Sequence, residues 1–142
     1  MSVRESTARW EGDLRGGKGS MRLGSGAFEG QYSFSSRFEE GTGTNPEELI
    51  AAAHSGCYSM ALSGALGRNE TPPTRITTTA KVHLDKAEVG FHVPLIELIC
   101  VAEVPGIDEG TFQRIATDVK SACPISKLLA AAEITLQATL KN

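Results

Sequence analysis

The chain has 142 residues, of which 40% are hydrophobic and 22% are charged, and its formal net charge is −3. These values are ordinary for a folded protein and predict one domain, residues 1–142, whose core needs no disulfide framework. The basic residues form no run, which argues against nucleic-acid binding. Residues 1–12 are polar and lack the apolar segment of a secretory signal. No apolar stretch approaches the roughly 18 residues of a membrane helix, so we expect no membrane association and a cytoplasmic location.

The first forty residues predict three strands separated by glycine turns. Residues 7–10 and 18–23 are short strand candidates, with glycine pairs between and after them. From residue 32 to 38, aromatic and polar side chains alternate, which predicts a third strand. Its aromatic face is Tyr32, Phe34 and Phe38, and its polar face is Ser33, Ser35 and Arg37.

A long helix is predicted after the glycine-rich residues 41–44. Asn45 is a good N-cap, Pro46 suits the first helical position, and Glu48 completes the Asn variant of a capping box. Many residues that follow are small, so another backbone can approach closely, and we expect a central helix packed tightly inside a domain or a dimer. Its expected apolar stripe, which runs to about residue 66, is Leu49, Ala53, Cys57, Met60 and Gly64.

The rest of the chain predicts two strands, two helices and a last strand. Residues 75–84 and 93–104 alternate with period two, and Cys100 lies on the inward face of the second strand. A helix capped by Asp108 or Thr111 runs to about residue 121, and Cys123 and Pro124 start a short helix to about residue 132. Residues 133–140 form the final strand. The order βββαββααβ predicts an α+β fold, a mostly antiparallel sheet with helices on one face.

Cys123 and Cys57 are the candidate reactive thiols. Cys123 precedes a helix, where free N–H groups and the helix dipole favour the thiolate; the alternative is a small apolar residue at a helix junction. Cys57 lies on the expected apolar stripe, where a free cysteine usually serves as a small hydrophobic residue. A reactive Cys57 needs a nearby cation, because burial raises the pKa of a thiol. Arg37 is a candidate, although an arginine is most simply solvated.

Several other residues have a structural and a functional interpretation. Glu47 and Glu48 complement the dipole of the first helical turn, and either carboxylate could instead hold an arginine in a bidentate pair. Cys100 is most simply part of the core. His54 lies one turn before Cys57, but no Asp or Asn beside it would orient a Cys–His pair for acyl transfer. The three cysteines include no CxxC motif, so zinc and thioredoxin-like sites have no support.

Taken together and in this order, several segments resemble the OsmC branch of the OsmC/Ohr family of hydroperoxide reductases. The resemblance covers nearly the whole chain. Its segments are ARWEG (8–12), GTNPEELIAAAH (43–54), Cys57 with SMALS (59–63), VPGID (104–108), CPIS (123–126) and EITL (133–136).

The resemblance implies an OsmC-like fold, an intertwined homodimer with active sites at its interface, and a cysteine-based peroxidase that prefers organic hydroperoxides. It also implies a role in oxidative or osmotic stress and no metal or bound organic cofactor. By the family's pattern, Cys57 attacks the peroxide, Cys123 resolves, and Arg37 and Glu47 attend the thiol. In the Ohr branch the arginine comes from a position nearer Lys18.

The expected mechanism oxidises the Cys57 thiolate to a sulfenic acid and releases an alcohol; Cys123 then closes a disulfide, which an external dithiol reduces. Cys57 and Cys123 must therefore lie close together although 66 residues separate them. Two alternatives remain open: a redox sensor that uses the same disulfide, and a non-catalytic small-molecule-binding dimer on the same fold.

Overall fold

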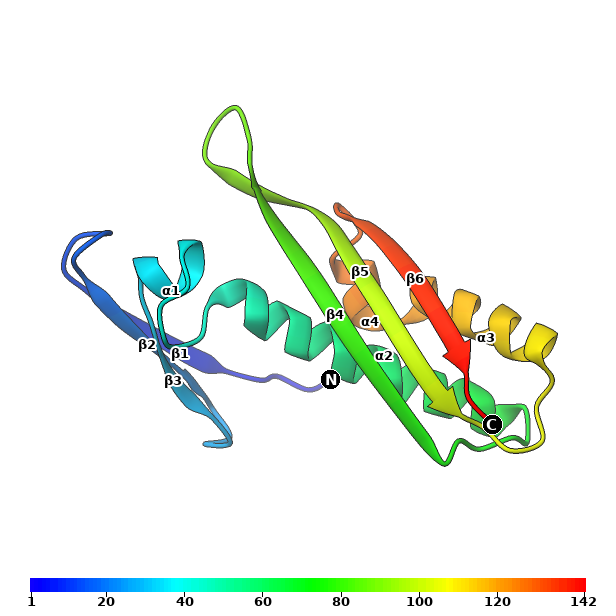
Figure 1. Cartoon of the computed structure of the whole chain (residues 1–142). Coiled ribbons are helices and arrows are strands. Elements are labelled where there is room, and N and C mark those ends of the chain that lie inside the picture. Colours follow the sequence, from blue (N-terminus) through cyan, green and yellow to red (C-terminus); the bar gives the residue numbers. More distant parts are fainter. The chain divides into compact units, whose positions relative to one another are not determined.

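The computed structural model describes residues 1–142, which form two compact units, Met1–Leu49 and Ile50–Asn142. The first contains three strands, a short helix and the start of a long helix; the second contains the rest of that helix, two further helices and three strands. In chain order the elements are β1 (Ser6–Glu11), β2 (Lys18–Leu23), β3 (Glu29–Tyr32), α1 (Phe34–Phe38), α2 (Pro46–Arg68), β4 (Arg75–Lys86), β5 (Phe91–Glu103), α3 (Glu109–Ala122), α4 (Pro124–Leu128) and β6 (Glu133–Leu140) (Figure 1).

The first unit is built on an antiparallel sheet in the order β1-β2-β3. One face carries Trp10 and Tyr32, whose ring centroids lie 5.3 Å apart across Gly19 of β2. A Cβ atom at Gly19 would come within 2.5 Å of the Tyr32 ring and 2.6 Å of the Trp10 ring. The aromatic contact therefore requires glycine at this position.

Residues 33–38 do not extend β3, so the predicted strand over Tyr32, Phe34 and Phe38 is wrong beyond Tyr32. The chain instead turns into α1 at Ser33, whose hydroxyl accepts from the Ser36 N–H at 3.1 Å, while the Ser36 hydroxyl accepts from the Ser33 N–H at 2.9 Å. This reciprocal capping box satisfies N–H groups at the helix start, and it outweighs the alternating pattern. Arg37 consequently lies on a helix.

Hydrogen bonds tie α1 to the start of α2. The Ser36 hydroxyl donates to the Thr44 carbonyl at 2.7 Å, and the Asn45 side-chain amide donates to the Ser36 carbonyl at 2.9 Å. Asn45 also caps α2 as predicted, because its side-chain oxygen accepts from the Glu48 N–H at 2.8 Å. The predicted capping box is only half formed, since the Glu48 carboxylate accepts from the Thr44 hydroxyl rather than from the Asn45 N–H.

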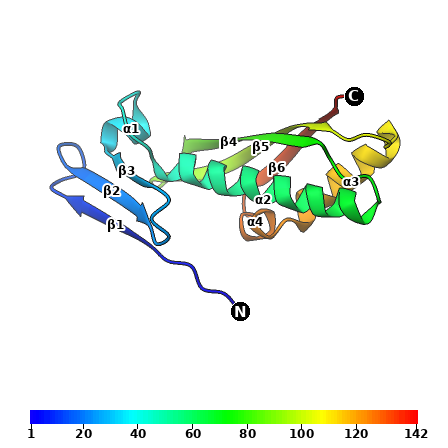
Figure 2. The same ribbon diagram turned by 90° about the horizontal axis from the view of Figure 1, so that it is seen from below.

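The second unit is a sheet in the order β4-β5-β6 with α2, α3 and α4 on one of its faces (Figure 2). β4 and β5 are antiparallel, and β5 and β6 are parallel. The α+β class and the helices on one face are confirmed. The order differs from the prediction by the extra helix α1, the strands form two sheets rather than one, and α4 ends at Leu128 rather than near residue 132.

The core of the second unit lies between this sheet and its helices. The inward face of β5 is buried as predicted, at Ile96, Leu98, Cys100 and Ala102. The stripe predicted for α2 is wrong, because Met60 is 79% exposed and Ala53 and Gly64 are exposed. The larger side chains of α2 fill the core instead, Ala61 and Ala65 pack at its edge, and several other small residues are exposed. The buried face is His54, Tyr58, Leu62 and Leu66.

By length and composition alone, α2 is apolar enough to cross a membrane, so the expectation that no stretch approaches that length is wrong. One such helix is weak evidence for a membrane protein, since core helices have the same composition. In the single chain 22% of this apolar window is buried, and the buried face packs against α3 and β4. The Tyr58 hydroxyl donates to the Ala116 carbonyl of α3 at 2.9 Å, and Ser59 donates to Thr78 of β4 at 2.8 Å.

Candidate functional site

Cys57 and Cys123 come together in the second unit. Their sulfur atoms lie 2.8 Å apart, although the residues are 66 positions apart in the sequence. Both are free thiols; Cys123 is fully buried and Cys57 is half-buried. The expectation that these two cysteines approach closely is confirmed, and oxidation can join them without a large movement of the chain.

Cys123 is held at the junction between two helices. Its N–H donates to the Val119 carbonyl at the end of α3, and its carbonyl accepts from the Lys127 N–H in α4, both at 3.0 Å. Pro124 at the first position of α4 ends the α3 geometry, because a proline disfavours a helical conformation in the residue before it. The Cys–Pro sequence thus places one thiol at a fixed bend opposite the middle of α2.

The surroundings of the two sulfurs move their pKa values in opposite directions. Burial raises the pKa of the Cys57 thiol, and the hydrogen bond with Cys123 raises it further. Burial opposes ionisation of Cys123 as well, but the hydrogen bond from Cys57, the N–H groups of Ser126 and Ile125 and the Ser126 hydroxyl outweigh it and lower the pKa. Within the second unit, the negative charge therefore belongs on Cys123. This agrees with the prediction from the helix terminus, and it means that a nucleophilic Cys57 needs an additional cation.

His54 lies in the same buried region as the thiol pair, where its partner is Ser126, a residue not predicted for the site. Its Nε2 lies 2.7 Å from the Ser126 hydroxyl, and both residues are buried. Its Nδ1 is buried without a hydrogen-bond partner, and burial lowers the pKa of the ring. The sequence held a signal for the position of Ser126, although none for its contact with His54. Ser126 follows the N-cap Cys123 by three residues, where side chains point back toward the cap.

In the first unit, Arg37 and Glu47 form a bidentate ion pair. Arg37 Nε and Nη2 donate to the two Glu47 carboxylate oxygens at 2.9 and 3.0 Å. The Glu47 side chain is only 12% exposed, and the guanidinium also lies over the Phe38 ring. The possibility that a glutamate of the first helical turn holds an arginine is therefore confirmed for Glu47. This geometry fixes the plane of the guanidinium.

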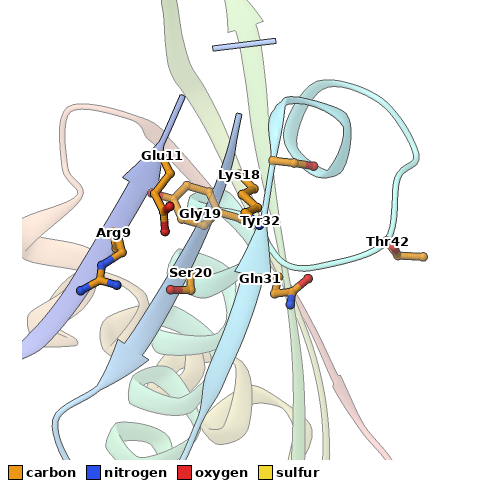
Figure 3. A pocket seen from close by; sticks show the side chains of 9 residues that line it. Arg9, Glu11, Lys18, Gly19, Ser20, Gln31, Tyr32 and Thr42 are labelled. Atoms are coloured by element: carbon orange, nitrogen blue, oxygen red, sulfur yellow. The ribbon is translucent and has the colours of Figure 1, made fainter. Parts of the chain in front are cut away.

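The first unit contains two cavities that are lined by residues of its sheet and of the segment that follows β3. Arg37 lines a cavity of about 240 Å³ whose other walls are mostly apolar: Trp10, Leu14, Tyr32, Ser33, Phe34 and Phe38. A second cavity, of about 230 Å³, is lined mostly by polar residues, and Figure 3 shows Arg9, Ser20 and Gln31 there on adjacent strands. Lys18 lines the second cavity, opposite Glu11 in the register of β1 and β2. Lys18 is the residue nearest to the position of the arginine in the Ohr branch, and in this protein it therefore lines the second cavity rather than the one that contains Arg37.

Cys100, the third cysteine, is a core residue and not part of the thiol pair. It lies on the inward face of β5 and is fully buried. Burial raises its pKa, and the hydrogen bond from Thr78 only partly opposes this. The prediction that Cys100 is a core residue is confirmed.

Two free thiols 2.8 Å apart can form a redox disulfide, so the site, rather than the α+β fold, indicates a thiol redox protein. The sequence comparisons identify which one. The family model described as OsmC-like protein matches residues 39–139, and the chain belongs to the OsmC family. It is 49% identical over 140 residues to Peroxiredoxin OsmC of Escherichia coli (strain K12), which covers 98% of this chain and 97% of the relative. The predicted family and the predicted enzyme class, a cysteine-based peroxidase, are confirmed by this relationship.

More distant proteins share part of the sequence or the fold. The chain is 29% identical over 87 residues to the Organic hydroperoxide resistance protein of Xanthomonas axonopodis pv. citri, which covers 61% of this chain and 59% of the relative. The crystal structure of an organic hydroperoxide resistance protein OsmC from Legionella pneumophila superimposes with a TM-score of 0.74 at 19% identity, over 98% of this chain and 99% of that one. This second likeness confirms the OsmC-like fold.

Proposed function

We propose that this protein reduces organic hydroperoxides, with Cys57 as the attacking thiol and Cys123 as the resolving thiol. The observation that carries the proposal is the 2.8 Å separation of the two sulfurs in a chain with peroxiredoxin relatives. The names of the more distant relatives support the organic substrate class. The apolar walls of the cavity beside Arg37 also suit the carbon skeleton of such a hydroperoxide.

The proposed reaction has two oxidative steps and one reduction. The Cys57 thiolate attacks the distal oxygen of the hydroperoxide, the O–O bond breaks, and the proximal oxygen leaves with a proton as an alcohol. The Cys123 thiolate then attacks the Cys57 sulfur, the S–O bond breaks, and hydroxide leaves and is protonated to water. An external dithiol reduces the disulfide by exchange and is itself oxidised. Each turnover therefore consumes one peroxide and one dithiol, and no metal or organic cofactor is needed.

Arg37 is the proposed cation for Cys57, and Glu47 holds its guanidinium in place. The pKa directions in the thiol pair support a cation from elsewhere, because they favour the charge on Cys123. Glu47 and Cys57 are ten residues apart on the continuous helix α2, which is about 15 Å along the helix axis. We therefore propose a homodimer in which the Arg37–Glu47 pair of one subunit attends Cys57 of the other.

The remaining proposals concern the protein as a whole. Residues 1–142 act as a single peroxidase domain, which is supported by the nearly complete coverage of the Escherichia coli relative. The protein works in the cytoplasm and contributes to resistance against oxidative or osmotic stress. The redox-sensor alternative uses the same disulfide but not repeated turnover, so consumption of many peroxide equivalents separates the two functions. A non-catalytic binding protein would consume none.

The test is peroxide consumption by three cysteine variants with an excess of dithiol. Cys57→Ser should abolish turnover, and Cys123→Ser should permit one attack, after which Cys57 is overoxidised to the sulfinic acid. Cys100→Val is the matched control and should turn over like the wild type. Mass spectrometry of the Cys57 peptide follows the oxidation. A folded Cys100→Val protein without turnover, or full turnover in Cys57→Ser, would show that the thiols are assigned wrongly.

A further inference from the structure

Near the resolving thiol lies a buried pair of residues, a serine and a histidine. Cys123, Ser126 and His54 are 0%, 3% and 0% exposed. Ser126 occupies the third position of α4 after the N-cap Cys123, and its N–H and hydroxyl help to lower the pKa of the Cys123 thiol. The other side of the hydroxyl lies 2.7 Å from Nε2 of His54, on α2. The proposed peroxidase mechanism uses neither His54 nor Ser126.

The unpaired ring nitrogen indicates the direction of these hydrogen bonds. Nδ1 of His54 is buried and has no partner, so a proton on Nδ1 would be a buried donor without an acceptor, which folded proteins rarely contain. The neutral ring therefore carries its proton on Nε2, and this N–H donates a hydrogen bond to the Ser126 oxygen. With that lone pair occupied, the single Ser126 proton is free to point toward Cys123. A neutral ring is also what its lowered pKa, caused by burial, favours.

We infer that His54 is a positioning residue for disulfide closure: it fixes the Ser126 hydroxyl as a hydrogen-bond donor to the Cys123 thiolate. This inference rests on the proposed role of Cys123 in resolution. During closure the Cys123 thiolate attacks the Cys57 sulfenic sulfur, and hydroxide leaves as the S–S bond forms. His54 neither gains nor loses a proton in this step. Instead, the hydrogen bond from His54 prevents the Ser126 hydroxyl from rotating its proton away from the Cys123 thiolate.

The experiment compares two rates in single turnover. Reduced protein is mixed with one equivalent of cumene hydroperoxide, and quenched samples are analysed by mass spectrometry for the Cys57 sulfenic acid, trapped with dimedone, and for the Cys57–Cys123 disulfide. A hydrogen bond to a charged group is worth roughly a tenfold change in rate or more. The ratio of the closure rate to the attack rate should therefore fall about tenfold or more in Ser126→Ala and in His54→Leu.

Two further variants separate positioning from packing. His54→Gln places an amide nitrogen where Nε2 was and should restore the ratio to near the wild-type value, whereas a ring needed as a proton acceptor would not be replaced by glutamine. Ser121→Ala removes an exposed hydroxyl from the last turn of α3 and should behave as the wild type. If His54→Leu does not fold, Ser126→Ala decides the question, because it removes one oxygen atom. A wild-type ratio in Ser126→Ala, or an equally low ratio in His54→Gln and His54→Leu, would overturn the inference.

A second measurement does not depend on peroxidase activity. In Cys57→Ser, Cys100→Val protein, the ultraviolet absorbance of the Cys123 thiolate is followed against pH. The midpoint should rise in Ser126→Ala and His54→Leu and not in His54→Gln. The other titratable group near Cys123 is Tyr58 on α2, which stays neutral because burial raises its pKa. An unchanged midpoint would contradict the inference even if Cys57 proved not to reduce peroxides, whereas failure of Cys57 to form a sulfenic acid would count against the proposed function alone.

Discussion

The subunit origin of Glu47 can be tested by mixing two inactive proteins. Cys57→Ser lacks the attacking thiol, and Glu47→Ala lacks the carboxylate that holds Arg37 through bonds of 2.9 and 3.0 Å. Glu47 and Cys57 lie on one continuous helix, about 15 Å apart along its axis, which is several times the roughly 3 Å of a hydrogen bond. A pair that attends Cys57 should therefore come from the other subunit of a two-fold dimer.

The size of the recovered activity follows from counting sites. Random exchange gives about half heterodimers, and each heterodimer holds one intact site, built from Cys57 of one chain and Glu47 of the other. The mixture should recover about a quarter of the wild-type rate of peroxide consumption per subunit. Heterodimers are quantified with two tags of different mass, and unmixed parents provide the baseline. If Glu47 served the Cys57 of its own chain, every heterodimer site would lack one residue. If heterodimers are shown to form but the mixture consumes peroxide only at the rate of the unmixed parents, the shared site is refuted.

Two further predictions concern stability. Tyr58→Phe should lower the free energy of unfolding by about 0.5–1.5 kcal/mol, measured by urea denaturation, because it removes a buried hydrogen bond from α2 to the Ala116 carbonyl of α3; an unchanged midpoint would show that this bond contributes little. Cys100 has a pKa raised by burial above its ordinary value of 9.0, so the stability it contributes is fully present below that value and is lost as the pH rises through the folded-state pKa. Unfolding free energies measured from neutral to alkaline pH should therefore fall more steeply in the wild type than in Cys100→Val, and parallel curves would contradict this.

Sequence patterns located the regular elements where local and tertiary preferences agree. β2 and β6 have the predicted bounds, Lys18–Leu23 and Glu133–Leu140, because glycine turns delimit β2 and the alternating pattern of β6 matches its alternating burial. The pattern failed at residues 33–38, where period two competed with a serine capping box. A five-residue helix has too few turns to show a helical period, so the two serines, three residues apart, were the only local signal.

The candidate site was predicted unevenly, for physical reasons. Period and spacing placed Cys100 in the core and Cys123 at a helix start, both from local sequence. The proximity of Cys57 to Cys123 is a tertiary contact between α2 and the α3–α4 junction, so only the family resemblance indicated it. His54 was considered only as a partner for Cys57, because the local sequence does not indicate a contact with a distant residue. Its partner, Ser126, lies 72 residues away.

The distance in sequence between Cys57 and Cys123 also connects the redox state to the entropy of the chain. A bond between residues 66 positions apart closes a long loop, which lowers the entropy of the unfolded ensemble and favours the native state by about 4 kcal/mol. The same free energy acts in reverse on the bond, because a fold that holds the two sulfurs together makes their disulfide harder to open. Reduction of the disulfide therefore costs this additional free energy. The oxidised form is correspondingly more resistant to unfolding until a reductant opens the bond.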